Sequence, residues 1–335
     1  MLTANLDSQP LSTPTPWKPA AGLTAEAKPL GELRPWRSAL ELGSIWIQIV
    51  AALAACFYFA SPIAYALTFL FIGARQYGLL ILLHDASHTL LHPSRRVNDA
   101  IALWLIAAPC GSSFVNSRAS HLRHHRHLGD PAGDPDYFLY CSGEPADKAS
   151  VGAFLWHFAK LISGGQIFHT LFSEQRRDKD SREVKAVDTV LGLVPVAVVQ
   201  AALLALFALA GHLEAYFLLW VLPLLTLAVF FNGLRVFCDH ANVVDRTGAS
   251  ESLLVSYLSN PVERFFVAPF HMNYHAEHHL CPFVPHYNLP RLRALILRST
   301  AHRDQIQWRP GYLKFVAEFL SHGTEARSVA KSEGS

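Results

Sequence analysis

Four long apolar stretches constrain what this chain can fold into more than any other feature. They are 18 to 24 residues long, and they are Gly43–Ala60, Ile63–Leu83, Val187–Ala210 and Leu213–Val236. A helix of that length crosses the roughly 30 Å hydrocarbon core of a bilayer. Only 16% of the residues are charged, whereas soluble domains carry about a quarter. Buried helices of a soluble protein are the alternative. Four stretches in two close pairs favour an all-α integral membrane protein with four transmembrane helices.

The two pairs predict two helical hairpins with a defined orientation. The turns within the pairs, Ser61-Pro62 and Gly211-His212, contain no Lys or Arg. The opposite ends of the stretches are basic, with Arg34, Arg37, Arg95, Arg96 and the run RRDKDSREVK at residues 176–185. Because basic residues stay on the cytoplasmic side, we expect both termini and the long middle segment to be cytoplasmic.

Shorter apolar segments and charges inside the stretches need a separate interpretation. Ala100–Ala108 and Val151–Ile162 are too short to span, so we expect them at the membrane interface as amphipathic or re-entrant helices. Asp188 and Glu214 lie near the ends of their stretches, where they can reach water. Arg75 lies deeper. It is either a functional residue or a sign that its helix leaves the membrane earlier.

The ends of the chain differ from its middle in composition. The first 30 residues contain five prolines, and the last 15 are polar. We predict disordered tails at residues 1–38 and 321–335 around a membrane domain at residues 39–320. The N-terminal tail has no apolar segment typical of a secretory signal. The five cysteines form no CxxC pair, which fits a reducing compartment, and a net charge of +2 gives no indication of nucleic-acid binding.

Three histidine clusters carry the functional signal. In LLHDASHTLLH, His84 and His88 are four residues apart, so on a helix they share one face. HLRHHRH and HAEHH repeat a spacing of i, i+3 and i+4. The histidines with this spacing are His121, His124 and His125, and then His275, His278 and His279. Imidazoles held in this way by rigid helices can converge on a metal ion.

The number of histidines favours two metal ions over one. Structural zinc takes four ligands and catalytic zinc usually three, whereas the three clusters offer eight histidines. A nitrogen-rich ligand set with few carboxylates suits iron that acts on dioxygen. A pair of zinc ions is the main alternative. Copper is disfavoured, since no Cys or Met lies within the clusters.

The motifs HDASH, HLRHH and NYHAEHH, followed by PFVPHYNLPRL, resemble those of the integral-membrane fatty acid desaturases and hydroxylases, whose relatives include carotenoid ketolases and sphingolipid desaturases. The resemblance extends from about Ile45 to Leu297. It implies four transmembrane helices in two hairpins, with a cytoplasmic helical cap that carries the histidine boxes and two iron ions. It also implies a ninth ligand, His240 in RVFCDH. The implied metal ligands are His84, His88, His121, His124, His125, His240, His275, His278 and His279.

The resemblance implies an oxidoreductase with O2 as co-substrate that introduces a double bond into a lipid acyl chain, without catalytic residues beyond the metal ligands. A lipid or carotenoid hydroxylase or ketolase on the same scaffold is the alternative, and GDPD at residues 133–136 resembles the ketolases. The chain contains no GxGxxG loop, P-loop or His-Pro-Gly-Gly haem signature. We therefore expect an external electron donor, a ferredoxin or a small haem protein with its reductase. The basic run at 176–185 would dock it or bind anionic membrane lipid.

The remaining carboxylates and histidines are weaker candidates for a role at the metal site. A metal-bound histidine usually donates its second N–H to a carboxylate; the candidate carboxylates are Asp85, Asp130, Asp134, Asp136, Asp239 and Glu277. A solvated turn is the alternative for the acidic segment at 129–137. We expect His92, His127, His271 and His286 near the site rather than on the metal. The isolated histidines, which we do not place at the site, are His157, His169, His212, His302 and His322.

Two hypotheses of other classes remain open on these residues. A membrane zinc hydrolase would use histidines to activate water, with fewer ligands than the clusters offer. A metal carrier without catalysis would place its ligands inside the spans, whereas the clusters lie at span ends and beyond. The sequence does not name the substrate, its head group or the position that is attacked.

Overall fold

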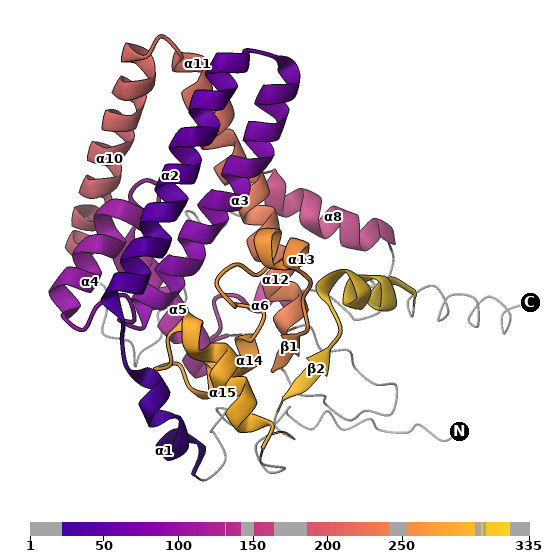
Figure 1. Ribbon diagram of the computed structural model, residues 1–335. Helices are drawn as coiled ribbons and strands as arrows, with labels where there is room; N and C mark the ends of the chain where they lie inside the picture. Colours follow the sequence, from indigo (N-terminus) through magenta and orange to yellow (C-terminus); the bar gives the residue numbers. More distant parts are fainter. Residues whose placement is uncertain are drawn as a thin grey trace, which may run out of the picture.

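The computed structural model describes residues 22–130, 132–141, 151–163, 186–240, 254–298, 303 and 306–321. Within these residues, four helical stretches are long and apolar enough to cross a membrane: α2 (Pro35–Phe59), α3 (Pro62–Ser87), Gly192–Leu209 within α10 (Ala186–Leu209), and Leu213–His240. The four predicted stretches are thus confirmed as helices, and α2, α3 and the last one extend further than their apolar runs. Figure 1 shows them side by side, with the shorter elements gathered around one end.

The junction between α2 and α3 is set by three consecutive residues. Ala60 adopts φ 44° and ends α2 in the left-handed conformation. Ser61 then accepts a hydrogen bond from the backbone N–H of Ala64 at 3.2 Å, and Pro62 occupies the first turn of α3. The two long helices α2 and α3 are therefore joined by a tight, capped turn.

Helix α3 lies at the centre of the long helices. In its most apolar window 67% of the residues are buried, against 22% for α2 and 17% for the α10 span. Gly73 allows α3 to approach the fourth stretch closely, because a Cβ built there would lie 2.7 Å from Cβ of Leu227. The outer helices instead expose large apolar side chains, such as Ile47 of α2 and Leu206 of α10, as expected of surfaces that face lipid.

The fourth stretch is continuous but changes its helical winding. It consists of α11 (Leu213–Ala215), two π-helical turns, η3 (Tyr216–Val221) and η4 (Leu224–Ala228), and α12 (Val229–His240). In a π turn each carbonyl pairs with an amide one residue further along than in an α-helix. The Trp220 carbonyl in η3 also accepts a hydrogen bond from the side chain of buried Gln76 in α3, at 2.8 Å. A backbone group at membrane depth is thereby satisfied by a neighbouring helix.

The segment after α3 returns toward the long helices. It contains α4 (Arg95–Ile101) and the π turn η2 (Ala102–Ala107), which together cover the predicted short helix at 100–108. Gln200 of α10 donates to the carbonyls of Ala108 and Pro109, both at 2.8 Å. These bonds anchor the turn that leads into α5 (Phe114–His127), α6 (Tyr137–Cys141) and α8 (Val151–Ile162). In Figure 1, α8 lies transverse to the long helices, beside α12.

The last part of the described chain contains a small sheet that the sequence did not predict. Strands β1 (Val255–Tyr257) and β2 (Gln307–Arg309) pair in parallel. The accompanying elements are α13 (Pro261–Phe266), α14 (His275–Leu280), η5 (His286–Asn288), α15 (Leu289–Ile296) and a helical segment at 312–321. Asn273 donates to the carbonyl of Tyr257 at 2.8 Å, and the amide of Ala276 donates to the hydroxyl of Ser256 at 3.2 Å. The sheet therefore holds the start of α14 in place.

Part of the segment expected to be disordered is helical. Within 1–38, the structure has α1 (Leu23–Ala27), the 3-10 turn η1 (Lys28–Gly31) and the start of α2. Leu23 is fully buried, and the Leu30 carbonyl accepts a hydrogen bond from Asn288 at 2.7 Å. Composition alone missed these tertiary contacts. Residues 1–21, 322–335 and the basic run at 176–185 lie outside the described residues, so the proposed division into domains stays a prediction.

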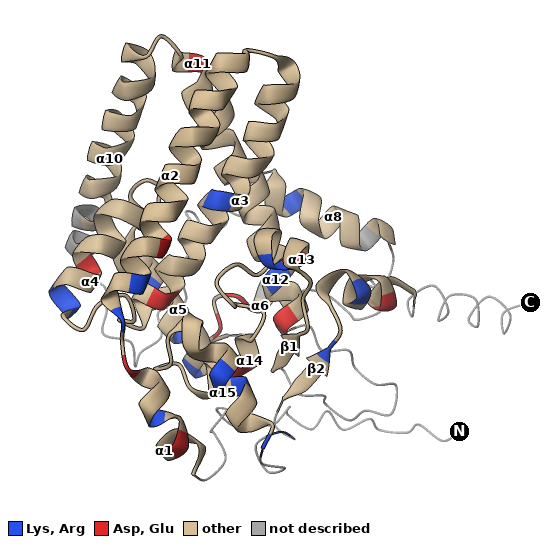
Figure 2. Cartoon of the chain, viewed as in Figure 1, with Lys and Arg blue, Asp and Glu red and all other residues tan. Residues whose placement is uncertain are grey.

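Charge is distributed unevenly along the long helices. Figure 2 shows Lys, Arg, Asp and Glu concentrated around α1, α4, α5 and α15, whereas the opposite ends of the described long helices are almost uncharged apart from an acidic position in α11. That position is Glu214, which is exposed and lies 3.7 Å from His212. Arg75 is buried; it donates to the Phe265 carbonyl at 3.2 Å and joins α3 to α13. The side chain of Asp188 lies outside the described residues.

Replacing Gly73 by alanine tests the close packing of α3. Alanine is favoured over glycine in a helix by about 1 kcal/mol, but overpacking at this contact costs about 1–3 kcal/mol. We expect Gly73→Ala to lower the unfolding temperature in detergent relative to Gly43→Ala, because a Cβ at Gly43 meets nothing within 4 Å. An unfolding temperature for Gly73→Ala at or above that of Gly43→Ala would contradict the contact.

Candidate metal centre

Nine buried or half-buried histidines gather where α3, α5, α12 and α14 meet, and they form two groups. The first histidine group consists of His84, His88, His121, His125 and His278. The second histidine group consists of His124, His240, His275 and His279. In each group the ring nitrogens that could hold a metal all lie within 4.8 Å of one another. The structure therefore brings together all nine histidines singled out from the sequence, although the clusters are up to about 190 residues apart in the chain (His84 to His275).

The two HxxHH boxes divide between the groups by one rule. Residues i and i+4 of a helix lie on the same face, and residue i+3 is rotated away from i+4 by about 100°. On α5, His121 and His125 therefore join the first group while His124 points to the second. On α14, His275 and His279 join the second group while His278 points to the first. Each box thus contributes to both groups, and the two boxes hold the groups side by side.

The separations between ring nitrogens match those of ligands around a common ion. His88 Nε2 lies 2.7 Å from His121 Nε2, and His278 Nε2 lies 3.1 Å from His125 Nε2. In the second group, His275 Nε2 lies 3.0 Å from Nε2 of both His240 and His279. Two nitrogens bound to one metal ion at about 2.1 Å and at right angles are roughly 3.0 Å apart.

Burial keeps most of these rings neutral, the form that binds metals. Burial, reinforced by the neighbouring histidines, holds the pKa of five rings well below the ordinary value: His121, His125, His275, His278 and His279. Burial lowers the pKa of His88 to about 3. His84 Nε2 is buried and has no hydrogen-bond partner within the described residues. Neutral rings with converging nitrogens and an orphaned acceptor fit a pair of bound metal ions.

His124 differs because it has a carboxylate partner. Its Nδ1 lies 2.8 Å from Oδ1 of buried Asp134 and 3.7 Å from Oδ2 of Asp136. Burial opposes the charged ring, but the hydrogen bond to Asp134 and the charges of both carboxylates raise the pKa of His124. When Nδ1–H donates to Asp134, the lone pair of Nε2 is left for a metal, which is the usual carboxylate–histidine arrangement of metal sites.

Comparison with known proteins agrees with this geometry. The family model for fatty acid desaturase matches residues 60–312. The chain belongs to the fatty acid desaturase family. It is 26% identical over 301 residues to the dihydrorhizobitoxine desaturase of Bradyrhizobium elkanii, covering 87% of this chain and 82% of that protein. It is 31% identical over 225 residues to a beta-carotene ketolase of Paracoccus sp. (strain PC1), covering 64% and 74%.

A third relative is the sphingolipid delta(4)-desaturase of Drosophila melanogaster, 26% identical over 229 residues that cover 67% of this chain and 64% of that protein. The chain is thus an oxidoreductase of the desaturase family. Its relatives include desaturases and carotenoid ketolases, so both the predicted activity and its alternative are supported. Four apolar helices and the family together indicate an integral membrane protein.

A second carboxylate of this desaturase-family site is held by a histidine outside the two groups. Asp85 follows His84 in α3, and its Oδ2 accepts hydrogen bonds from the amide of His286 at 3.2 Å and from Nδ1 at 2.7 Å. His286 Nε2 lies 2.8 Å from Oε2 of Glu41 in α2. Burial opposes the charged ring, but Asp85 and Glu41 raise the pKa of His286 to about 9. His286 is therefore a cation between two carboxylates and not a member of either group, as expected.

The other candidate carboxylates have different partners. Asp239 accepts from Arg235 at 2.8 Å, and the Arg235 guanidinium lies 3.3 Å from His275 Nδ1. Glu277 of the third cluster accepts from the Ser256 hydroxyl, so it joins α14 to β1. Asp130 caps its own turn by accepting from the amide of Ala132 at 2.9 Å. Glu41, Arg235 and Ser256 were not anticipated, although Arg235 and Asp239 stand four residues apart in RVFCDH, a spacing typical of helical ion pairs.

The remaining histidines lie outside both groups, as far as the structure describes them. His92 accepts from the Ser94 amide at 3.0 Å, and His127 lies 3.9 Å from Asp130. His271 stacks on Tyr274, and burial lowers its pKa to about 4. The isolated residues His157 and His212 stay distant from the two groups, with ring contacts to Phe158 and Phe57. His169, His302 and His322 lie outside the described residues.

Asp134→Asn tests the partner of His124. The amide keeps the shape of the carboxylate but loses its charge, so it holds the His124 tautomer less firmly. We expect the variant to bind metal about 10- to 100-fold more weakly, measured as metal retained during dialysis against a chelator of known affinity. Asp130→Asn, in the same loop, is the matched control and should retain metal like the parent. Equal retention by both variants would show that Asp134 does not support the centre.

Proposed function

We propose that this chain is an O2-dependent di-iron oxidoreductase that introduces a double bond into a lipid acyl chain. The observation that carries the proposal is the pair of histidine groups, with five and four converging ring nitrogens. All nine histidines are proposed as iron ligands, one ion in each group. Nitrogen-rich sets without thiolates or carboxylates among the converging ligands suit iron that reacts with dioxygen. The desaturase family membership supports the reaction class.

Bound iron supplies the oxidising power to remove two hydrogens from adjacent carbons of an unactivated chain, together with dioxygen as the final acceptor. The protein's own residues do the rest. The boxes on α5 and α14 fix the distance between the two groups, since each contributes rings to both. Asp134 orients His124, and Arg235 and Met272 lie against the outer nitrogen of His275 at 3.3 and 3.4 Å. Burial of these rings keeps bulk water away from the reacting chain.

The membrane arrangement belongs to the same proposal. We infer that α2 and α3 form one transmembrane hairpin and that α10 and Leu213–His240 form the other. The histidine groups, α1 and the basic residues of α4 would then lie together on the cytoplasmic side as a helical cap, with both termini. The charge distribution in Figure 2 supports this orientation, because the turn at residues 60–62 is free of Lys and Arg while Arg34 and Arg95 are at the opposite end.

We infer that a separate protein supplies the electrons. The family's reaction consumes two electrons more than the substrate provides, and the sequence has no dinucleotide-binding fingerprint. We propose that the electron donor is a ferredoxin or a small haem protein with its reductase. The basic run at 176–185, its suggested docking segment or anionic-lipid contact, lies outside the described residues.

Metal analysis with two histidine variants tests the centre. We expect about two iron ions per purified chain, one for each histidine group. His278→Ala removes a ligand of the first group and His124→Ala one of the second, so each should lose about half of the iron or more. Both should abolish product formation and still insert into the membrane. His127→Ala, on the same helix as His124 but outside both groups, is the control and should keep iron and activity.

The contrary outcomes are distinct. Zinc in place of iron, with hydrolytic activity, would favour the membrane zinc hydrolase. Readily exchanged metal with no turnover would favour a carrier. Normal product formation by His278→Ala or His124→Ala would refute the assignment of the groups as a catalytic centre.

A carotenoid ketolase is the second candidate, and one observation favours it. The carboxylates of Asp134 and Asp136 lie 2.8 and 3.7 Å from Nδ1 of His124, and both residues belong to the GDPD segment that resembles the ketolases. A beta-carotene ketolase is also 31% identical to the chain over 225 residues. On this proposal both activities would use the same two histidine groups, and they differ in the substrate and in the product, a double bond or a keto group.

Product profiling separates the two candidates. The chain and its His278→Ala variant are expressed in a host that makes both saturated acyl lipids and beta-carotene, with a matching electron donor. We expect new unsaturated acyl chains with the parent chain, absent with the variant, measured by mass spectrometry of total lipid. Ketocarotenoids without new unsaturated acyl chains would establish the second candidate in place of the first.

A further inference from the structure

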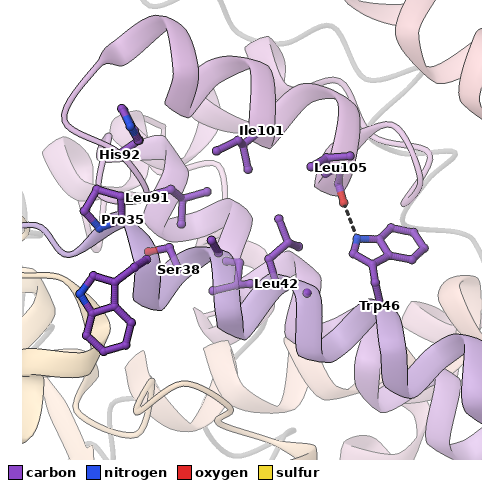
Figure 3. Close-up of a pocket in the computed structure, with 12 residues that line it drawn as sticks. Pro35, Ser38, Leu42, Trp46, Leu91, His92, Ile101 and Leu105 are labelled. Atoms are coloured by element: carbon purple, nitrogen blue, oxygen red, sulfur yellow. Dashed lines mark hydrogen bonds between the residues drawn. The ribbon is translucent and has the colours of Figure 1, made fainter.

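A cavity of about 450 Å³ lies between α2 and the segment formed by α4 and η2 (Figure 3). Its floor includes Leu82 of α3 and Leu91, which come just before and just after the pair His84 and His88 in sequence. None of the nine histidines of the candidate metal centre is among the described residues that line it. The cavity is therefore lined by other residues than the candidate metal centre.

One end of the cavity is apolar and contains a specific contact between α2 and η2. Leu42, Trp46 and Leu105 line this end, and Trp46 Nε1 donates to the Leu105 carbonyl at 3.1 Å, the dashed line in Figure 3. The bond joins α2 to η2 and satisfies the indole, so this end offers carbon surface. The volume is within the range of small-molecule sites, which are about 300–1,000 Å³ and mostly apolar.

The other end of the cavity contains two polar side chains, Ser38 and His92, which do not hydrogen-bond to each other. Ser38 is only 6% exposed, and its hydroxyl has no hydrogen-bond partner within the described residues. Figure 3 shows it near the end where Pro35 and His92 lie. His92 accepts the Ser94 amide at Nδ1, so in the neutral ring the proton is on Nε2. A buried hydroxyl is normally hydrogen-bonded, so Ser38 offers an unused hydrogen-bonding group at this end of the cavity.

The lining offers no counter-charge to an anionic head group. No Lys, Arg, Asp or Glu is among the described residues that line the cavity. Two nearby cations have partners elsewhere: the Arg37 guanidinium lies over the ring of Tyr287, and Arg95 lies 3.7 Å from Asp99. A buried carboxylate or phosphate without a cation is costly, whereas an ester or hydroxyl oxygen matches Ser38 and His92.

We propose that this cavity binds an uncharged single-chain lipid, with ester or hydroxyl oxygens at Ser38 and His92 and the hydrocarbon chain toward Leu42, Trp46 and Leu105. The site does not depend on iron, because no residue of the two histidine groups takes part. Its occupant packs between α2 and η2, against the α3 segment that positions His84 and His88.

Photolabelling of the full chain in nanodiscs tests the site. The probe is a monoacylglycerol with a diazirine in its acyl chain, and the labelled residues are mapped by mass spectrometry. Gly43→Phe fills the cavity without a backbone clash, since Gly43 lines it and a Cβ at this position meets nothing within 4 Å. We expect labelling of α2 and η2 to fall at least tenfold in Gly43→Phe and to persist in Gly43→Ala. Unchanged unfolding temperature and metal content show that both variants are folded.

Two further arms test the polar end. A diazirine fatty acid with the same chain but a free carboxylate should label these elements several-fold less than the monoacylglycerol. Ser38→Ala should reduce monoacylglycerol labelling while labelling by an alkane probe stays the same. Equal labelling of the cavity residues in Gly43→Phe and the parent, or preferential labelling by the fatty acid, would overturn the proposal. Metal is also measured in the parent chain, and its absence there would count against the metal centre without affecting the labelling comparison.

Discussion

The structure depends on keeping nine imidazoles out of water with their nitrogens converging. Rings packed this closely repel one another when protonated, and burial disfavours the charged form further, as the lowered pKa of His121 and His278 shows. Two neutral rings at such short range can pair only when one ring nitrogen donates and the other accepts. A bound cation would instead accept the lone pairs of several rings at once, so we expect metal binding to stabilise the surrounding helices.

The long helices make that convergence possible at modest entropic cost. Ligands on loops would each have to be ordered separately, whereas seven of the nine histidines sit on α5, α14 and the end of α12, and His84 lies in the last turn of α3. Gly73 and the π turns of the fourth stretch bring α3 and α12 close enough for their ends to meet. The apolar spans thus act as the rigid frame of a polar centre just beyond their ends.

The sequence predicted the parts that depend on periodicity and missed those that depend on contacts distant in the chain. The length of the apolar stretches predicted the four long helices, and the i, i+3, i+4 spacing of the histidines predicted that each HxxHH box lies on a helix. The spacing alone did not assign each ring to a group, because the assignment requires the direction of each helix axis. The sheet that holds α14 and the helices at 23–31 were missed, since Ser256, Asn273 and Leu23 owe their positions to tertiary partners. His240 came only from family resemblance, as a lone histidine has no periodic signal.

A buried ionic chain explains why the residues after the last histidine box matter to the site. Glu41, His286 and Asp85 come from α2, η5 and α3, and a charge at any of these positions would be costly without its neighbours. Because His286 bonds to Asp85 through both its amide and its ring, the segment after α14 is held against the helix that carries His84. The relative position of the first and third boxes is thus stabilised by an ion chain within the protein itself. Such a chain can preserve the approximate positions of His84 and His278 before any metal binds.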